Sequence, residues 1–169
     1  MSEVAPEPSG GGAGAGAAVL EALATIHLFK GLSSDSLDKI AAISGEVAHK
    51  RGALVFREGD LGDQLYLILE GKIRISRQLP GMGEEALAVL GPGEAFGEMS
   101  LIDDVPRSAD AHVHESCRLL TITREAFEDL LFLHKELAYE ILWNFIKILS
   151  GRLRETNDKM AFMSVTGRF

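Results

Sequence analysis

The chain has 169 residues, and 46% of them are apolar, which is enough to build the core of one ordinary domain. Its 25 acidic and 17 basic residues leave a net charge of -8, a sign that disfavours binding of nucleic acid or of an anionic membrane surface by this chain alone. The single cysteine, Cys117, excludes a disulfide framework, and no apolar run approaches the roughly 20 residues of a membrane-spanning helix. We therefore expect a cytoplasmic protein with no membrane segment.

The first segment, residues 1–18, is rich in glycine and alanine and has almost no large apolar side chain. Such a segment cannot bury enough apolar surface to offset the entropy of ordering it. We predict a disordered leader here. A folded domain is predicted over residues 19–133, and a C-terminal helix with a tail over residues 134–169.

Helical spacing of apolar residues begins at Val19 and predicts a first helix that ends before Gly31. A serine cap at Ser33 or Ser34 begins a second helix, which is predicted to run to about Ile43. Two short helices are therefore expected before the first strand.

Between Glu46 and Thr123, short apolar or alternating runs are separated by turns that contain glycine. Such runs are typical of β-strands, and their spacing is too short for the helical crossovers of a parallel sheet. Closure into a compact barrel or roll leaves few unpaired strand edges. We predict a mainly β fold with flanking helices, built on an antiparallel β-roll. The predicted strands cover residues 53–56, 64–69, 72–76, 86–90 and 117–123.

After Thr123 the apolar period becomes helical, first over residues 124–132 and then from about Glu136 to Met163. In the longer run, apolar residues recur alternately every three and four positions, which is the seam of a coiled coil. Gly151 interrupts the run at a cost of about 1 kcal/mol relative to alanine. A two-chain coiled coil and a helix packed on its own domain are both open, and one helix can serve both surfaces. The seam consists of Tyr139, Leu142, Ile146, Leu149, Leu153, Thr156, Met160 and Met163, while Trp143, Phe145 and Ile148 lie off it.

The stretch from Phe96 to Ala109 separates two predicted strands and is longer than a hairpin needs. Gly97 lets the backbone approach a ligand closely, and a helical turn over residues 98–102 would offer free N–H groups to an anion. The guanidinium of Arg107 can fork onto two phosphate oxygens. The Glu98 carboxylate would be repelled by a phosphate, so we expect it to accept a hydrogen bond from a nearby hydroxyl. A sugar hydroxyl beside a phosphate predicts a nucleotide.

This stretch resembles the phosphate-binding cassette of cyclic-nucleotide-binding domains, the family found in bacterial catabolite activator proteins, protein kinase regulatory subunits and cyclic-nucleotide-gated channels. The resemblance extends from about Ile26 to the C-terminus and includes Gly59-Asp60 and Glu70-Gly71 in the strands before the cassette. It implies a jelly-roll-like β-roll, or double-stranded β-helix, with N-terminal helices and a long C-terminal helix. The matching cassette residues are Phe96, Gly97, Glu98, Leu101, Pro106, Arg107, Ser108 and Ala109.

The resemblance also implies roles for individual residues. Glu98 would bind the ribose 2′-hydroxyl, and Arg107 would bind the exocyclic phosphate oxygens. Further phosphate bonds would come from the backbone N–H groups of Gly97, Ser108 and Ala109 and from the Ser108 hydroxyl. The remaining residues predicted to line the ligand here are Ile75 and Leu87 on the apolar side, and Phe96, Met99 and Ser100 in the cassette.

The C-terminal residues are similar to those of the catabolite activator family in particular. Residues 152–159 and 161–168 resemble its long dimerisation helix and hinge. The resemblance implies a homodimer in which Thr156 faces the base and Asn157 reaches across from the other subunit. It also places Arg152 near the cassette glutamate.

Ser108 bears on the choice of base. In the family, a threonine directly after the cassette arginine tends to mark guanine selectivity, because its hydroxyl meets the guanine amino group. This chain has a serine there, which favours adenine. We therefore predict a non-enzymatic receptor module that binds cyclic AMP rather than cyclic GMP, uses no metal, and signals through its C-terminal helix to an unidentified partner.

Three alternatives stay open. In the catabolite activator family a helix-turn-helix follows the hinge, whereas this sequence stops at Phe169, so one alternative is a fragment of a Crp/Fnr-type transcription regulator. A second is a cupin-like metal enzyme, because His112 and His114 form a His-x-His pattern on one face of a strand. The third is an interaction module that has lost its ligand, which the intact Glu98 and Arg107 argue against.

Overall fold

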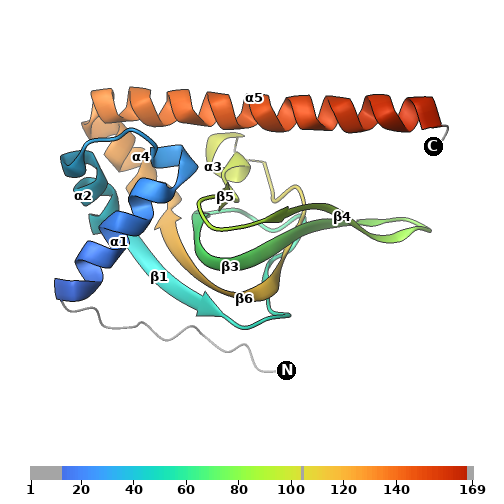
Figure 1. Ribbon diagram of the computed structural model, residues 1–169, viewed down its shortest axis with the longest axis horizontal. Helices are drawn as coiled ribbons and strands as arrows, with labels where there is room; N and C mark the ends of the chain where they lie inside the picture. The colour runs from blue at the N-terminus through green and yellow to red at the C-terminus, as the bar shows by residue number, and fades with distance from the viewer. Residues whose placement is uncertain (1–12, 104, 167–169) are drawn as a thin grey trace.

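The computed structural model describes residues 13–103 and 105–166. A β-roll forms its centre, α1, α2 and α4 gather at one end of the roll, and α5 runs along the whole molecule (Figure 1). The helices that precede the first strand or follow the last one are α1 (Ala13–Thr25), the 3-10 helix η1 (His27–Phe29), α2 (Ser34–Ala42), α4 (Arg124–Leu133) and α5 (Lys135–Thr166).

Helix α1 begins earlier than predicted. Residues 13–18 belong to the helix, so the prediction of a disordered leader is wrong for them. Alanine has the highest helix propensity, and Val19 and Leu20 anchor the helix by packing against the core, so the alanine-rich segment extends it. Residues 1–12 of the predicted leader lie outside the described residues.

Helix α2 begins at the predicted serine pair. The backbone N–H of Ser36 donates to Ser33 Oγ at 3.2 Å, which makes Ser33 the N-cap. The helix ends at Ala42, one residue before the predicted end.

The strands form one antiparallel sheet that curls into the predicted roll. Their order is β1-β6-β3-β4, with β2 paired to β6 and β5 paired to β3. The roll therefore has long strands at its centre and short ones at the rim. The strands are β1 (Ser44–His49), β2 (Leu54–Phe56), β3 (Gln64–Leu79), β4 (Gly83–Leu90), β5 (Ala95–Phe96) and β6 (Asp110–Thr123).

Strand β3 contains two of the predicted strands. It continues through Gly71, which lies between the predicted strands over residues 64–69 and 72–76. Gly71 has a φ of 81°, and the pairing of β3 with β6 shifts register on both sides of it. A bulge of this kind bends a strand without ending its pairing. One strand can therefore connect the helical end of the roll to the opposite end.

We expect Gly71→Ala to destabilise the domain severely. A Cβ at this position would meet the Ser116 carbonyl oxygen and lie 2.8 Å from Cys117 Cα, in addition to the strain of a side chain at positive φ. Gly81→Ala is the matched control, because Gly81 has a φ of 76° and no atom within 4 Å of its Cβ position. Urea denaturation should show a loss of at least about 3 kcal/mol for Gly71→Ala and about 1–2 kcal/mol for Gly81→Ala. Equal losses would contradict this reading of the bulge.

Strand β1 has no counterpart among the predicted strands. Its residues include one large apolar side chain, Val47, so no apolar run marks it. It pairs with β6 from Ser44 opposite Ile122 to His49 opposite Cys117. Pairing in the tertiary structure, rather than local composition, makes this segment a strand.

Two apolar clusters form the core. The first joins the helices to one end of the roll, and Leu65, Leu67, Leu120 and Ile122 contribute to it from the sheet. The second fills the other part of the roll and includes Phe96. Around this second cluster three aromatic rings stack or tilt against one another: the Tyr66 and Phe96 centroids are 5.0 Å apart, and the Phe56 centroid is 5.8 Å from both.

Helix α5 buries one face and exposes another. Its buried side chains pack on the first cluster, whereas the predicted seam stays open: Ile146 is 54% exposed and Leu153 is 62% exposed. Figure 1 shows the helix extending past the roll, above the β3–β4 hairpin. The domain therefore covers one side of α5 and leaves the seam uncovered. The buried side chains are Leu137, Ala138, Ile141 and Phe145.

Helix α5 also continues through the first part of the predicted hinge and ends at Thr166. Residues 167–169 of the predicted tail, and the side chain of Met163, lie outside the described residues. In the described ranges, no helix combines the length and the apolar character that crossing a membrane requires.

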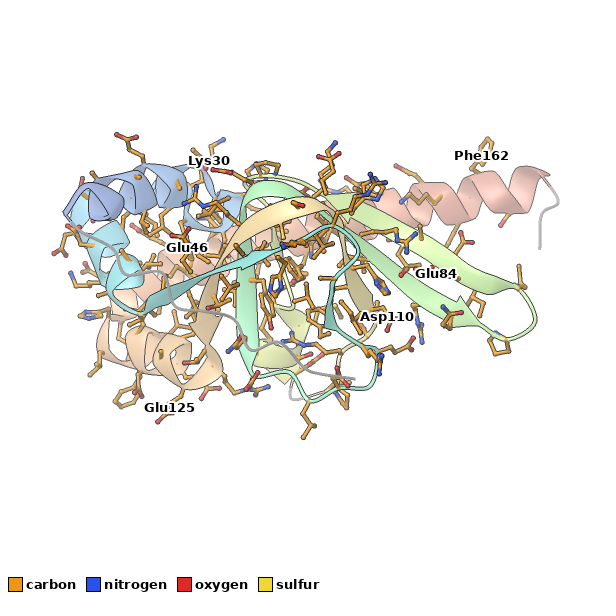
Figure 2. All side chains as sticks on the ribbon, turned by 90° about the horizontal axis from the view of Figure 1, so that it is seen from below. Lys30, Glu46, Glu84, Asp110, Glu125 and Phe162 are labelled. Carbon is orange, nitrogen blue, oxygen red and sulfur yellow. The ribbon has the colours of Figure 1, made fainter. Side chains whose placement is uncertain are left out.

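A polar network stiffens the β3–β4 hairpin. Ser76 is fully buried and donates to Glu84 Oε1 at 2.6 Å, and Arg74 Nη2 donates to the same oxygen at 2.7 Å. Figure 2 shows Glu84 on this hairpin, seen from below. The network holds in place the two strands that carry Ile75 and Leu87.

Candidate functional site

A cavity of about 630 Å³ lies between the roll and α5. In Figure 1, α3 (Met99–Asp103) and β5 lie beneath α5, and residues of all three elements line the cavity. All the predicted site residues except Asn157 line it: Ile75, Leu87, Phe96, Gly97, Glu98, Met99, Ser100, Arg107, Ser108, Ala109, Arg152 and Thr156.

Asn157 is exposed and lies away from the cavity. It follows Thr156 on α5, and successive residues of an α-helix point about 100° apart, so the two side chains face different directions. Our prediction places Asn157 in the site of a second subunit, and it stays a prediction.

Other lining residues were missed by sequence reasoning. Helical spacing could have found Ile148, Gly151 and Glu155, which lie within four positions of Arg152 on α5. No local signal marks His27 of η1, which the fold brings to the rim of the cavity. The remaining missed residues are Phe56, Ala88, Leu90, Glu94, Ala95, Lys147 and Lys159.

The chain turns at Gly97, between β5 and α3. Gly97 has a φ of 76°, and a Cβ there would lie 2.5 Å from Arg107 Nη1 and 3.2 Å from the Gln64 carbonyl oxygen. Conformation and space therefore both require glycine. The helical turn predicted over residues 98–102 is present as α3, shifted by one residue.

Arg107 is 4% exposed and is held from several sides. Its Nη1 donates to the Gly97 carbonyl oxygen at 2.7 Å, and its Nη2 donates to the Gln64 carbonyl oxygen at 2.8 Å. Its guanidinium carbon lies 4.2 Å from the Phe56 ring centroid. These contacts fix the plane of the guanidinium. The sequence predicts that this guanidinium binds two phosphate oxygens. It does not predict that the carbonyl oxygens of Gly97 and Gln64 also accept from it.

The electrostatics of Arg107 favour an anion beside it. Burial lowers the pKa of its guanidinium, while Tyr66, Asp63 and Glu98 act in the opposite direction. An arginine keeps its charge in proteins, so a positive charge is buried here. Its Nε has no hydrogen-bond acceptor within the described part of the chain. A buried donor without an acceptor is costly, and an anionic oxygen that reaches this nitrogen would remove that cost.

Glu98 connects the cassette to α5. It is 4% exposed and forms an ion pair with Arg152, whose Nη1 donates to Glu98 Oε1. Arg152 Nη2 also donates to the Ala95 carbonyl oxygen at 2.8 Å. Arg152 therefore ties α5 to both β5 and the residue before α3. The placement of Arg152 beside Glu98 is the one implied by the family resemblance.

Thr156 lies one turn after Arg152 on the same helix. Its hydroxyl donates to the Arg152 carbonyl oxygen at 2.9 Å, and its side chain lines the cavity. It is also a residue of the predicted seam. One residue of α5 therefore belongs to both the cavity wall and the uncovered face.

The His-x-His pattern lies on the outer face of the roll. His112 and His114 alternate along β6 with Ala111 and Val113, which are buried in the core. Cupin-like metal binding needs ligands that converge, and in residues 13–103 and 105–166 no group of three or more His, Cys, Asp or Glu side chains is arranged to hold a metal. The cupin-like alternative therefore has no ligand set in this part of the chain.

The curled antiparallel roll places a helical turn, a buried arginine and a neighbouring carboxylate around one cavity. Residues 46–134 match the family model described as "Cyclic nucleotide-binding domain". The chain belongs to the cyclic nucleotide-binding domain family. This confirms the family resemblance and the β-roll predicted from the sequence.

Individual relatives agree with this membership. The "Cyclic AMP receptor protein" of Thermus thermophilus is 39% identical over 137 residues, which are 81% of this chain and 62% of that protein. The "CRP-like cAMP-activated global transcriptional regulator" of Mycobacterium tuberculosis is 33% identical over 151 residues, 88% of this chain and 66% of that protein. The crystal structure of a cyclic nucleotide-binding domain from Methylobacillus flagellatus superposes with a TM-score of 0.79 at 30% identity, covering 92% of this chain and 87% of that one. The chain thus spans less than two thirds of the length of each of these two curated relatives.

Proposed function

We propose that this chain is a regulatory module that binds cyclic AMP in the cavity and signals through α5. One observation carries the proposal: the Glu98–Arg152 ion pair joins the cassette to α5 at a cavity that Arg107 also lines, and within the described residues the buried Nε of Arg107 has no acceptor. A ligand that binds there touches both the roll and the helix. The role is regulatory and not enzymatic.

The cyclic phosphate would bind at Arg107. Support comes from the buried guanidinium, whose Nε is a donor without an acceptor in the described residues. The backbone of Ser108 and Ala109 follows it along the cavity wall and can donate further N–H bonds. A charge-assisted hydrogen bond of this kind is worth about 1.5–3 kcal/mol. Two or three of them supply most of the free energy of a micromolar complex, which is about 8 kcal/mol.

The ribose 2′-hydroxyl would donate to Glu98. A carboxylate has two oxygens, and Arg152 contacts Oε1, so Oε2 can accept from the hydroxyl. The arginine also neutralises the carboxylate, which would otherwise repel the phosphate.

The base is proposed to be adenine. Ser108 lines the cavity where a threonine would favour guanine in this family, and two relatives bear names that specify cyclic AMP. On the apolar side, Ile75 and Leu87 line the cavity from the β3–β4 hairpin. A register shift at Ile75–Ser76 leaves Leu87 without a paired partner, which lets it and Ala88 both reach the cavity.

A second copy of the chain is the proposed partner of the seam. The seam residues from Tyr139 to Met160 are exposed along a helix whose last turns are covered by no other element in the described part of the chain. A long exposed helix with an apolar stripe is stabilised by pairing with another. Because Thr156 lies on both the seam and the cavity wall, a ligand that favours one arrangement of α5 would change the packing of the dimer.

A second candidate function is ligand sensing within a longer transcription regulator. It is favoured by the name of the Mycobacterium tuberculosis relative, of which this chain covers 66%. The net charge of -8 argues that DNA contact would be made by other parts of such a protein. Sequencing of the source gene beyond Phe169 tests this candidate. Both candidates place the protein in the cytoplasm.

The proposed ligand is tested by thermal unfolding of the purified protein with cyclic AMP, cyclic GMP and 2′-deoxy cyclic AMP. A ligand at 100 times its dissociation constant adds about 2.7 kcal/mol, which raises the melting temperature by about 5–10 °C for a domain of this size. We expect the largest rise with cyclic AMP and smaller rises with the other two. The 2′-deoxy compound lacks the hydroxyl that Glu98 would accept from. No rise with any of the three contradicts the proposal.

A further inference from the structure

Gly151 is a glycine that the fold does not require. It lies within α5, where glycine costs about 1 kcal/mol relative to alanine. Unlike Gly97, it has a helical rather than a positive φ, and a Cβ built on it meets no atom of the described residues within 4 Å. Neither backbone conformation nor a neighbouring group therefore explains the absence of a side chain.

Gly151 lines the cavity, in the same stretch of α5 as Ile148 and Arg152. Arg152 is anchored to Glu98 and to the Ala95 carbonyl oxygen, so this turn of the helix is held at a fixed distance from the cassette. A side chain at position 151 would therefore project into space that the helix cannot vacate without breaking these bonds.

Close approach of a second helix does not account for Gly151. In the predicted seam, Leu149 and Leu153 take the two core positions of a heptad. Gly151 then falls at the heptad position farthest from the seam. A small residue that allowed two helices to pack closely would lie on the seam itself.

We infer that Gly151 sets the size of the ligand cavity, and that its missing side chain leaves the room in which the base of a purine cyclic nucleotide lies against α5. The inference rests on the proposed function. Ile148 on one side offers an apolar surface to the base, and Thr156 on the other offers a hydroxyl. The loss of helix stability at Gly151 is then compensated by ligand binding.

The test compares Gly151→Ala and Gly151→Leu with the wild-type protein. Both variants should melt at a higher temperature than the wild type without ligand, because both residues favour helix over glycine. Calorimetric titration should show weaker binding of cyclic AMP, by about threefold for Gly151→Ala and by at least about tenfold for Gly151→Leu, because the side chain overpacks the cavity. Gly16→Ala is the matched control: Gly16 is helical, has no atom within 4 Å of its Cβ position, and lies in α1, away from the cavity.

The control should melt at a higher temperature and bind cyclic AMP as the wild type does. Wild-type affinity in both Gly151 variants would overturn the inference and leave the proposed function intact. A change in dimer mass by light scattering, shared by both variants, would also overturn it, since Gly151 would then act at the helix pair. If Gly151→Leu does not fold, the Gly151→Ala result decides. If the wild type binds no cyclic nucleotide, the proposed function itself fails, and this inference with it.

Discussion

Replacing Arg107 with alanine is expected to abolish cyclic-nucleotide binding and also to lower the melting temperature of the ligand-free protein. The first effect follows because the phosphate loses its buried cation, with each charge-assisted bond worth about 1.5–3 kcal/mol. The second follows because the carbonyl oxygens of Gly97 and Gln64 lose their donors and Phe56 loses the guanidinium that covers its ring. Thermal unfolding with and without cyclic AMP measures both effects in one experiment.

Arg118→Ala is the matched control for this substitution. Arg118 also pairs with carboxylates, at 2.8 Å from Glu46 and 2.6 Å from Glu70, but its side chain is 45% exposed and is not among those that line the cavity. Exposed ion pairs contribute little to stability, so the control should keep its ligand-induced rise in melting temperature. A ligand-induced rise that persists in Arg107→Ala would show that the phosphate is bound elsewhere.

Ile146→Asp is expected to convert the proposed dimer into a monomer while the domain stays folded. Ile146 is 54% exposed in the single chain, so an aspartate there is tolerated by the fold. In a paired seam the same aspartate would be buried at a core position opposite its own copy, which costs several kcal/mol. Light scattering should report the mass of one chain for the variant and of two chains for the wild type.

Arg154→Asp serves as the control for the seam. It also places an aspartate on an exposed position of α5, but outside the alternating three-and-four spacing of the seam. The control should keep the dimer mass, and both variants should keep the circular dichroism of the wild type. A wild-type protein that scatters as a single chain, with and without cyclic AMP, would contradict the dimer proposal.

The cassette could be predicted from the sequence because its chemistry is local. Gly97, Glu98 and Arg107 lie within one short stretch, and the order of a close-approach glycine, an acceptor and a cation predicts a ligand with a phosphate and a hydroxyl. The long C-terminal helix was predictable for the same reason, since its apolar spacing persists over many turns. In both cases the signal lies in residues that are neighbours in sequence.

The features that were missed depend on partners distant in sequence. Strand β1 is a strand because β6 pairs with it, and Gly71 continues β3 because the same neighbour accommodates a bulge. The acceptors of Arg107 include the Gln64 carbonyl oxygen, a backbone group that no sequence pattern marks. Helix α1 began early because alanine's helix propensity outweighed the intervening glycines.

The most direct measurement is a crystal structure of the protein grown with cyclic AMP. We predict one nucleotide in each cavity, with its phosphate oxygens within hydrogen-bond distance of the Arg107 guanidinium and its 2′-hydroxyl on the Glu98 carboxylate. The Glu98–Arg152 ion pair should persist, with the adenine beside Gly151 and Thr156. A nucleotide bound outside this cavity, or one whose phosphate and ribose touch neither Arg107 nor Glu98, would contradict the proposal.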